Sequence, residues 1–157
     1  MSGMTRPDPA GRIVTTLLVL LVALGPISTD LYLPALPEIG RSFTADVPTI
    51  QLTLSVYMIA FALGQLIYGP LSDRFGRRAP LIGGTALYFA ASILCLVAPT
   101  IEWLIAGRLL QGIGGCAGQV IARAVVRDVH GRESAGRVLA KIAAAMGFAP
   151  AVGPAIG

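Results

Sequence analysis

Two charged residues, Asp30 and Arg108, stand within long apolar stretches of this sequence. A charged side chain is costly in the apolar core of a membrane, so such residues are functional candidates by default. Asp30 precedes Pro34 by about 6 Å of helix, and Arg108 follows Glu102 by about 9 Å of another helix. If both distances start at one membrane face, the two charges lie at similar depth and can pair, because each would otherwise be uncompensated.

A carboxyl group beside a guanidinium is the local element that proton coupling requires. Protonation of Asp30 would release Arg108. The pKa of this carboxyl group would then depend on the conformation and on bound ligand. A second interpretation is that Asp30 only reaches the outer membrane interface or caps the end of a broken helix. Both interpretations require helices that cross a membrane.

The composition predicts such helices. Hydrophobic residues make up 55% of the chain and charged residues 13%, whereas soluble domains average about 25% charged residues. Spanning an apolar core takes about 20 helical residues. Runs of suitable character cover 13–29, 47–72, 79–101 and 103–126, and a fifth span begins over 142–157. A secretory signal peptide is a competing interpretation of the first run alone.

We therefore predict an all-α polytopic membrane protein. Residues 1–12 form a cytoplasmic tail, and residues 13–157 form transmembrane helices 1–5. The fifth run stops at residue 157 without a polar end, and a helix that ends within hydrocarbon leaves carbonyl groups unpaired. We expect the chain to be an N-terminal fragment whose partners include further C-terminal helices.

The basic residues predict the orientation. Cytoplasmic loops carry an excess of lysine and arginine, and nearly all of these residues fall on one side: Arg6, Arg12, Arg74, Arg77, Arg78, Arg123, Arg127, Arg132, Arg137 and Lys141. Arg41 falls on the other side. The N-terminus is thus expected in the cytoplasm, so the net charge of +4 indicates membrane topology and no nucleic-acid partner.

Nothing in the sequence indicates an enzyme, a cofactor or a metal site. Cys95 and Cys116 lie in predicted membrane helices without metal-ligand spacing, and His130 is the single histidine. We interpret the cysteines as packing residues. The sequence also has no phosphate-binding glycine loop with a lysine, so ATP is not the evident energy source.

The decapeptide 69–78 connects two apolar runs and is expected to form a short hairpin turn, with glycines that permit a tight reversal. Its typed positions resemble the Gly-x-x-x-Asp-Arg-x-Gly-Arg-Arg signature of the major facilitator superfamily: Gly69, Asp73, Arg74, Gly76, Arg77 and Arg78. In that family the signature lies between the second and third transmembrane helices. An ordinary basic cytoplasmic loop is the alternative.

Two further stretches resemble branches of this family. Leu104-x-x-x-Arg108-x-x-Gln111-Gly112-x-Gly114 is similar to the fourth-helix motif of proton-coupled antiporters, which implies that Arg108 takes part in proton transfer. Residues 28–37 resemble the end of the first helix in the Bcr/CflA drug-resistance branch. Gly114 and Gly118 form a small-x-x-x-small pair, which lets membrane helices approach closely.

A third stretch, Gly153-Pro154-Ala155-Ile156-Gly157, resembles the Gly-Pro motif of drug and proton antiporters and favours export. Ala149 departs from the pattern, which often has glycine at that position.

Together the resemblances imply the first five helices of a six-helix N-terminal bundle in a transporter that exports drugs or other small amphipathic molecules in exchange for protons. Residues 69–78 would act as a cytoplasmic gate that contacts helix ends, including one of a second bundle. The substrate would contact helices one, two, four and five, with candidates Tyr32, Tyr57, Phe61 and Gln119. The alternatives are a non-transporting remnant or partial gene product, and a sugar or metabolite exporter of the same fold.

Overall fold

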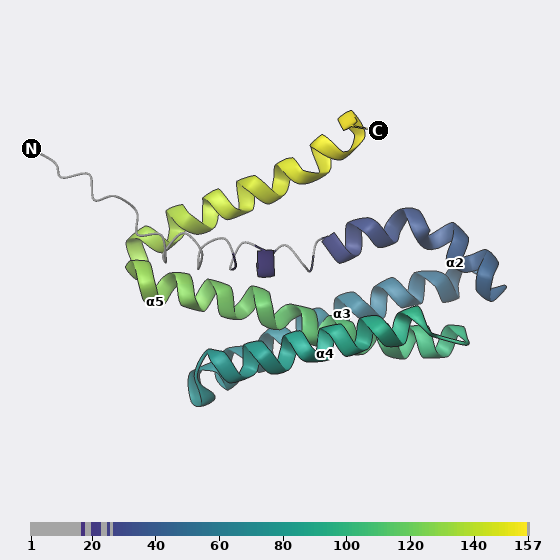
Figure 1. Cartoon of the computed structure of the whole chain (residues 1–157), viewed down its shortest axis with the longest axis horizontal. Helices are drawn as coiled ribbons and strands as arrows, with labels where there is room; N and C mark the ends of the chain where they lie inside the picture. The colour runs from purple at the N-terminus through teal and green to yellow at the C-terminus, as the bar shows by residue number, and fades with distance from the viewer. Residues whose placement is uncertain (1–16, 18–19, 23–24, 26, 157) are drawn as a thin grey trace, which may run out of the picture.

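The structure is a computed structural model that describes residues 17, 20–22, 25 and 27–156, with side chains up to residue 128. Its elements are η1 (Leu33–Ala35), α2 (Leu36–Phe43), α3 (Val47–Phe75), α4 (Arg78–Leu96) and α5 (Ile101–Ile156) (Figure 1). The described residues contain helices and turns but no strand, which confirms the predicted all-α class.

Three described segments are long and apolar enough to cross a membrane: Val47–Phe75, Arg78–Leu96 and Ile101–Asp128. They correspond to the predicted second, third and fourth spans. The first predicted span, 13–29, falls largely outside the described residues. The backbone of the fifth, 142–157, is helical up to Ile156.

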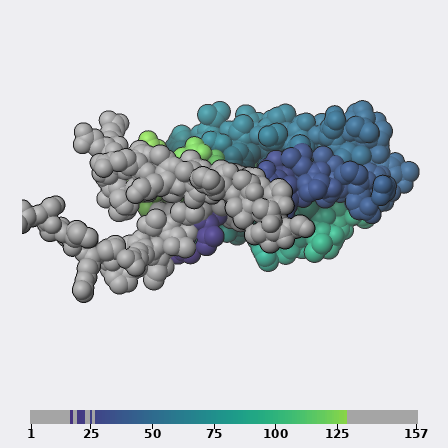
Figure 2. Space-filling model, turned by 90° about the horizontal axis from the view of Figure 1, so that it is seen from above, coloured from purple at the N-terminus to yellow at the C-terminus, as the bar shows by residue number. Residues whose placement is uncertain are grey.

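The prolines after the first span do not open a loop. Residues 27–32 are helical and lead through η1 directly into α2, so that irregular chain begins only after Phe43. Pro34 and Pro37 occupy the first turns of η1 and α2, where a missing N–H group leaves no helical hydrogen bond unmade. In Figure 2, η1 and α2 lie over one end of α3 and α4.

The predicted turn over 69–78 is also shorter than expected. Helix α3 continues past Pro70 to Phe75, and α4 begins at Arg78. Gly76 carries the reversal with φ 77° and ψ 168°, a conformation that is essentially restricted to glycine. The predicted antiparallel hairpin is present, because α3 and α4 run in opposite directions (Figure 1).

The loop predicted between the fourth and fifth spans is helical. A single element, α5, runs from Ile101 to Ile156, and its ribbon bends so that the last part runs back along the molecule (Figure 1). No proline interrupts the sequence between Arg127 and Ala149, and the arginine, alanine and leucine residues there favour helix. Polarity predicted a loop at this position, but helix propensity prevails.

Helix α5 is the centre of the described bundle, since α3 and α4 each pack against it more extensively than against each other. The core joins Tyr68 of α3 to Cys116, Ala117 and Ile121 of α5. Large apolar side chains on the outer faces remain exposed, such as Leu66 at 73% and Leu96 at 85%. Such outward apolar surface is what a lipid environment requires.

Glycines allow the helices to approach closely, as four of them illustrate. A Cβ atom on Gly84 would collide with Ala117, and one on Gly114 would lie 2.5 Å from the backbone nitrogen of Tyr88. A Cβ atom on Gly112 would lie 2.5 Å from the carbonyl oxygen of Tyr57, and one on Gly118 3.0 Å from that of Leu21. Side chains at these positions would push the helices apart.

Candidate functional site

Arg108 lies in the interior of the helix bundle, where only 4% of it is exposed. Its guanidinium carbon is 3.3 Å from the ring centroid of Tyr32 and 5.2 Å from that of Tyr57. Tyr32 comes from the helical segment before η1, and Tyr57 from α3. A cation over an aromatic face is stabilised by the ring quadrupole, most strongly where water is excluded.

The hydrogen bonds of Arg108 are incomplete. Nη1 donates to Oε1 of Gln111 at 2.7 Å, and Nε2 of Gln111 donates to the hydroxyl oxygen of Ser92 at 2.8 Å. The buried Nε and Nη2 of Arg108 have no hydrogen-bond partner among the described residues. Unpaired donors of a buried cation are costly, so in this conformation the hydrogen-bonding capacity of the guanidinium is not fully used by the described residues.

Asp30 is exposed and lines a cavity of about 310 Å³. The other lining residues are small, polar, aromatic or, for Met58, aliphatic: Gly25, Thr29, Tyr57, Met58, Phe61 and Gln119. Three of the four residues named as candidate substrate contacts, Tyr57, Phe61 and Gln119, thus share one cavity with Asp30. The fourth, Tyr32, lies against Arg108 instead.

The proposed pairing of Asp30 with Arg108 is not present in this conformation. No ion pair joins these two described side chains, and the rings of Tyr32 and Tyr57 lie beside the guanidinium instead. Tyr57 borders both groups, since it lies near Arg108 and also lines the Asp30 cavity.

Hydroxyl groups fix the segment that carries Asp30 against the rest of the bundle. The hydroxyl groups of Tyr32 and Thr53 lie 2.7 Å apart, and that of Tyr57 donates to the carbonyl oxygen of Gly25 at 3.3 Å. Ser28 and Tyr88 also share a hydrogen bond. These contacts tie residues 25–32 to both α3 and α4.

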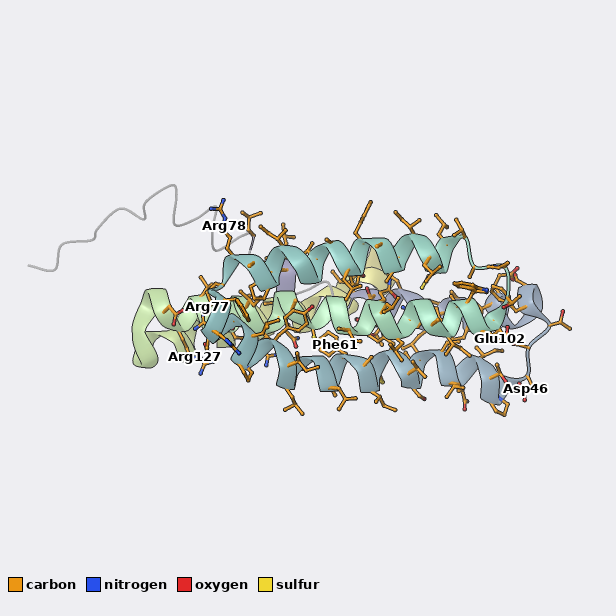
Figure 3. The ribbon with its side chains drawn as sticks, turned by 90° about the horizontal axis from the view of Figure 1, so that it is seen from below. Asp46, Phe61, Arg77, Arg78, Glu102 and Arg127 are labelled. Atoms are coloured by element: carbon orange, nitrogen blue, oxygen red, sulfur yellow. The ribbon has the colours of Figure 1, made fainter. Side chains whose placement is uncertain are left out.

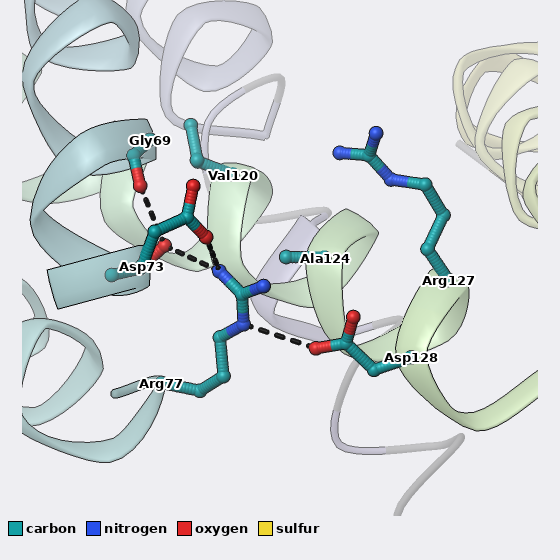
Figure 4. A pocket seen from close by; sticks show the side chains of 8 residues that line it. Gly69, Asp73, Arg77, Val120, Ala124, Arg127 and Asp128 are labelled. Atoms are coloured by element: carbon teal, nitrogen blue, oxygen red, sulfur yellow. Dashed lines mark hydrogen bonds and ion pairs between the residues drawn. The ribbon is translucent and has the colours of Figure 1, made fainter. Parts of the chain in front are cut away.

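A second polar cluster surrounds Arg77 at the α3–α4 turn (Figure 4). Its Nη1 donates to Oδ1 of Asp73 and to the hydroxyl oxygen of Ser72, both at 2.7 Å. Its Nε donates to Oδ2 of Asp128 at 3.1 Å. The hydroxyl of Ser72 donates in turn to the carbonyl oxygen of Gly69 at 2.9 Å, so the cluster connects the end of α3 to α5.

This cluster borders a cavity of about 330 Å³. Desolvation lowers the pKa of Arg77, but the hydrogen bonds and charges of Asp128 and Asp73 raise it, and the net direction is upward. The guanidinium therefore keeps its charge at any physiological pH.

Sequence reasoning named Asp73 and Arg77 but missed Asp128. An acidic residue directly after Arg127, at the end of the predicted fourth span, was the available signal.

The remaining predicted site residues have other surroundings. Arg74 and Arg78 are exposed and form no ion pair with any described side chain; the guanidinium of Arg74 lies 5.4 Å from the ring centroid of Phe75. Figure 3 shows Arg78 pointing away from the helices. Gly153 and Pro154 belong to the helical backbone of α5, and Gly157 lies outside the described residues.

Within the described part of the chain, no group of histidine, cysteine, aspartate or glutamate residues could hold a metal ion. The two polar centres are therefore the buried Arg108 with the Asp30 cavity, and the ion-paired cluster of Arg77.

Comparison with known proteins identifies the relatives. The profile of the Major Facilitator Superfamily matches residues 18–157. An uncharacterized MFS-type transporter of Bacillus subtilis, YdgK, is 39% identical over 153 residues, which cover 96% of this chain and 38% of the relative. A chloramphenicol resistance protein of Pseudomonas aeruginosa is 40% identical over 139 residues, covering 88% of this chain and 32% of the relative.

A third relative, multidrug resistance protein D of Escherichia coli, is 34% identical over 116 residues, covering 74% of this chain and 29% of the relative. The chain thus spans between 29% and 38% of the length of these three proteins.

Proposed function

This chain belongs to the major facilitator superfamily, and from that membership we propose that it is the N-terminal part of a proton-coupled exporter of drugs or other small amphipathic molecules. Relatives named for multidrug resistance and chloramphenicol resistance support export of drugs. The Bcr/CflA branch is the one proposed. The second bundle that alternating access requires would come from further C-terminal helices.

The observation that carries this proposal is the buried guanidinium of Arg108 with two unpaired donors, next to a tyrosine that lines the Asp30 cavity. A membrane protein retains such a costly group where it binds or moves charge. We assign proton binding to Asp30, which the cavity leaves accessible. We assign to Arg108 the stabilisation of the carboxylate form when a conformational change brings the two together.

The Arg77 cluster is proposed as the cytoplasmic gate. It joins the turn after α3 to α5 by hydrogen bonds that involve charged groups on both sides, so a movement of α5 relative to α3 must break or strain them. The proposed orientation places this turn and the N-terminus in the cytoplasm, in the inner membrane of a bacterium. This follows the distribution of basic residues.

Transport by the full-length protein in proteoliposomes tests the proposal. An imposed pH gradient should drive export of a drug such as chloramphenicol, and Asp30→Asn should abolish this coupling without lowering the amount of protein in the membrane. The matched control is Glu38→Gln, because Glu38 is an exposed carboxylate of α2, outside the cavity. If the unaltered protein exports the drug at a rate that does not depend on the pH gradient, proton coupling is refuted. If the gradient drives the movement of sugars instead of drugs, the metabolite exporter is favoured.

A double-mutant cycle tests the link between the two charges. If Asp30 reaches Arg108 in another state, the transport losses of Asp30→Asn and Arg108→Gln should be non-additive. Additive losses would show that the two groups act separately.

A further inference from the structure

An apolar groove opens between α3 and α4 at the end of the bundle that carries the arginines. It has a volume of about 280 Å³ and is lined by Tyr68, Leu71, Phe75, Ala79, Pro80, Gly83 and Gly84. The groove exists because both helices pack mainly on α5, so that they separate from each other on the opposite side. A Cβ atom on Gly83 would meet no atom within 4 Å, which shows that the space above this glycine is open.

Two arginines adjoin lining residues of this groove, and neither has a carboxylate partner among the described side chains. The guanidinium of Arg74 lies over Phe75, a wall of the groove, at 5.4 Å from the ring centroid. Arg78 directly precedes Ala79, another lining residue, and is exposed. Neither arginine forms an ion pair with a side chain that the structure describes, in contrast to Arg77 beside them.

We propose that this groove binds one phospholipid with an anionic headgroup. An acyl chain would lie along the apolar lining, and the phosphate group would accept hydrogen bonds from Arg74 and Arg78. Charge favours this occupant, because a phosphodiester can neutralise both guanidinium groups, whereas an apolar helix face would leave them unpaired. The anionic lipids of a cytoplasmic leaflet also match the orientation proposed above.

Lipid retention tests this inference without any measurement of transport, so its failure is distinguishable from failure of the proposed function. The full-length protein is reconstituted in vesicles of equal parts phosphatidylglycerol and phosphatidylcholine and then extracted into mild detergent. Mass spectrometry measures the lipid that remains bound. We expect phosphatidylglycerol to be enriched over phosphatidylcholine by roughly five-fold for each arginine.

Two pairs of variants separate the groove from the charges. Gly83→Leu fills the groove and should lower retention of both lipids, whereas Ala90→Leu adds the same bulk to an exposed position of α4 outside the lining and should not. Arg74→Gln with Arg78→Gln should remove only the preference for phosphatidylglycerol. Arg123→Gln, which removes an exposed arginine of α5, should leave this preference intact.

Three results would overturn the inference. Equal retention of the two lipids would show that the arginines do not select the headgroup. Unchanged retention in Gly83→Leu would show that lipid lies elsewhere. A mass for the extracted protein that corresponds to two copies, with no lipid bound, would show that a second copy covers the groove.

Discussion

The guanidinium of Arg108 is held mainly by aromatic rings and an amide, and not by a carboxylate. Tyr32 and Tyr57 provide the aromatic contacts, and Gln111 accepts its one side-chain hydrogen bond. A planar, delocalised cation suits such a site, because it can stack and donate hydrogen bonds at the same time. The positive charge is therefore fixed in orientation, while the described residues leave its Nε and Nη2 unpaired.

Arg108→Lys should abolish or strongly reduce drug export by the full-length protein. An ammonium group retains the charge but cannot stack on Tyr32 and donate to Gln111 in the same geometry. The measurement is the rate of export per amount of protein in the membrane. Arg123→Lys, at an exposed position of the same helix, is the control, and normal export by Arg108→Lys would mean that charge alone suffices.

The hydrogen bond between Arg77 and Asp128 should contribute only modestly to stability. Its side chains are 32% and 56% exposed, and ion pairs at such positions are typically worth about 0.2–1 kcal/mol. A double-mutant cycle of Arg77→Gln and Asp128→Asn, followed by unfolding in detergent, measures the coupling free energy. We expect this coupling to decrease when salt is raised, because exposed charges are screened; a coupling above this range would indicate a more buried network.

Gly84 and Gly83 are neighbours in α4 with opposite surroundings. A side chain at Gly84 would collide with Ala117 of α5, whereas one at Gly83 points into open space. Gly84→Val should therefore lower the free energy of unfolding by about 1–3 kcal/mol through overpacking, with little change for Gly83→Val. Equal unfolding midpoints for the two variants would contradict the close approach of α4 to α5.

Gly76 and Gly69 form a comparable pair at the α3–α4 turn. Gly76→Ala should lower the free energy of unfolding by about 1–3 kcal/mol, because its backbone angles suit only glycine. Gly69 lies within α3 with free space around it, so Gly69→Ala should be neutral or stabilise by up to about 1 kcal/mol. The same unfolding experiment compares both, and a destabilising Gly69→Ala would mean that the glycine meets a neighbour there.

The sequence predicted the individual helices better than their connections. The start of α3 at Val47 and the α3–α4 hairpin follow from charge-free runs and from the composition of the turn. The continuity of α5 through Arg127 does not, because a polar helix and a polar loop have similar composition. For the same reason the predicted second span ended at Ser72, although α3 continues to Phe75. The charged residues Asp73 and Arg74 are as compatible with the last turn of a helix as with a loop.

The candidate site was predictable in its charges but not in its contacts. Asp30 and Arg108 are conspicuous because charged residues are rare in apolar runs, and Arg77 belongs to a recognisable signature. The partners Tyr32, Tyr57 and Asp128 come from distant parts of the chain, and local spacing does not encode which of them meet. Aromatic residues are also common in membrane helices, so the sequence pattern does not indicate which of them stacks on an arginine.

The central position of α5 has a consequence for biosynthesis. Its spanning segment has a mean hydropathy of 1.3 with 61% of the residues buried, against 1.7 and 28% for α3 and 1.8 and 17% for α4. A segment that carries Arg108 enters a bilayer unfavourably by itself, but α3 and α4 are synthesised first and offer a protein surface instead of lipid. We therefore expect the α3–α4 hairpin to act as an intramolecular insertion partner for α5, so that defects in the hairpin reduce the amount of correctly inserted protein.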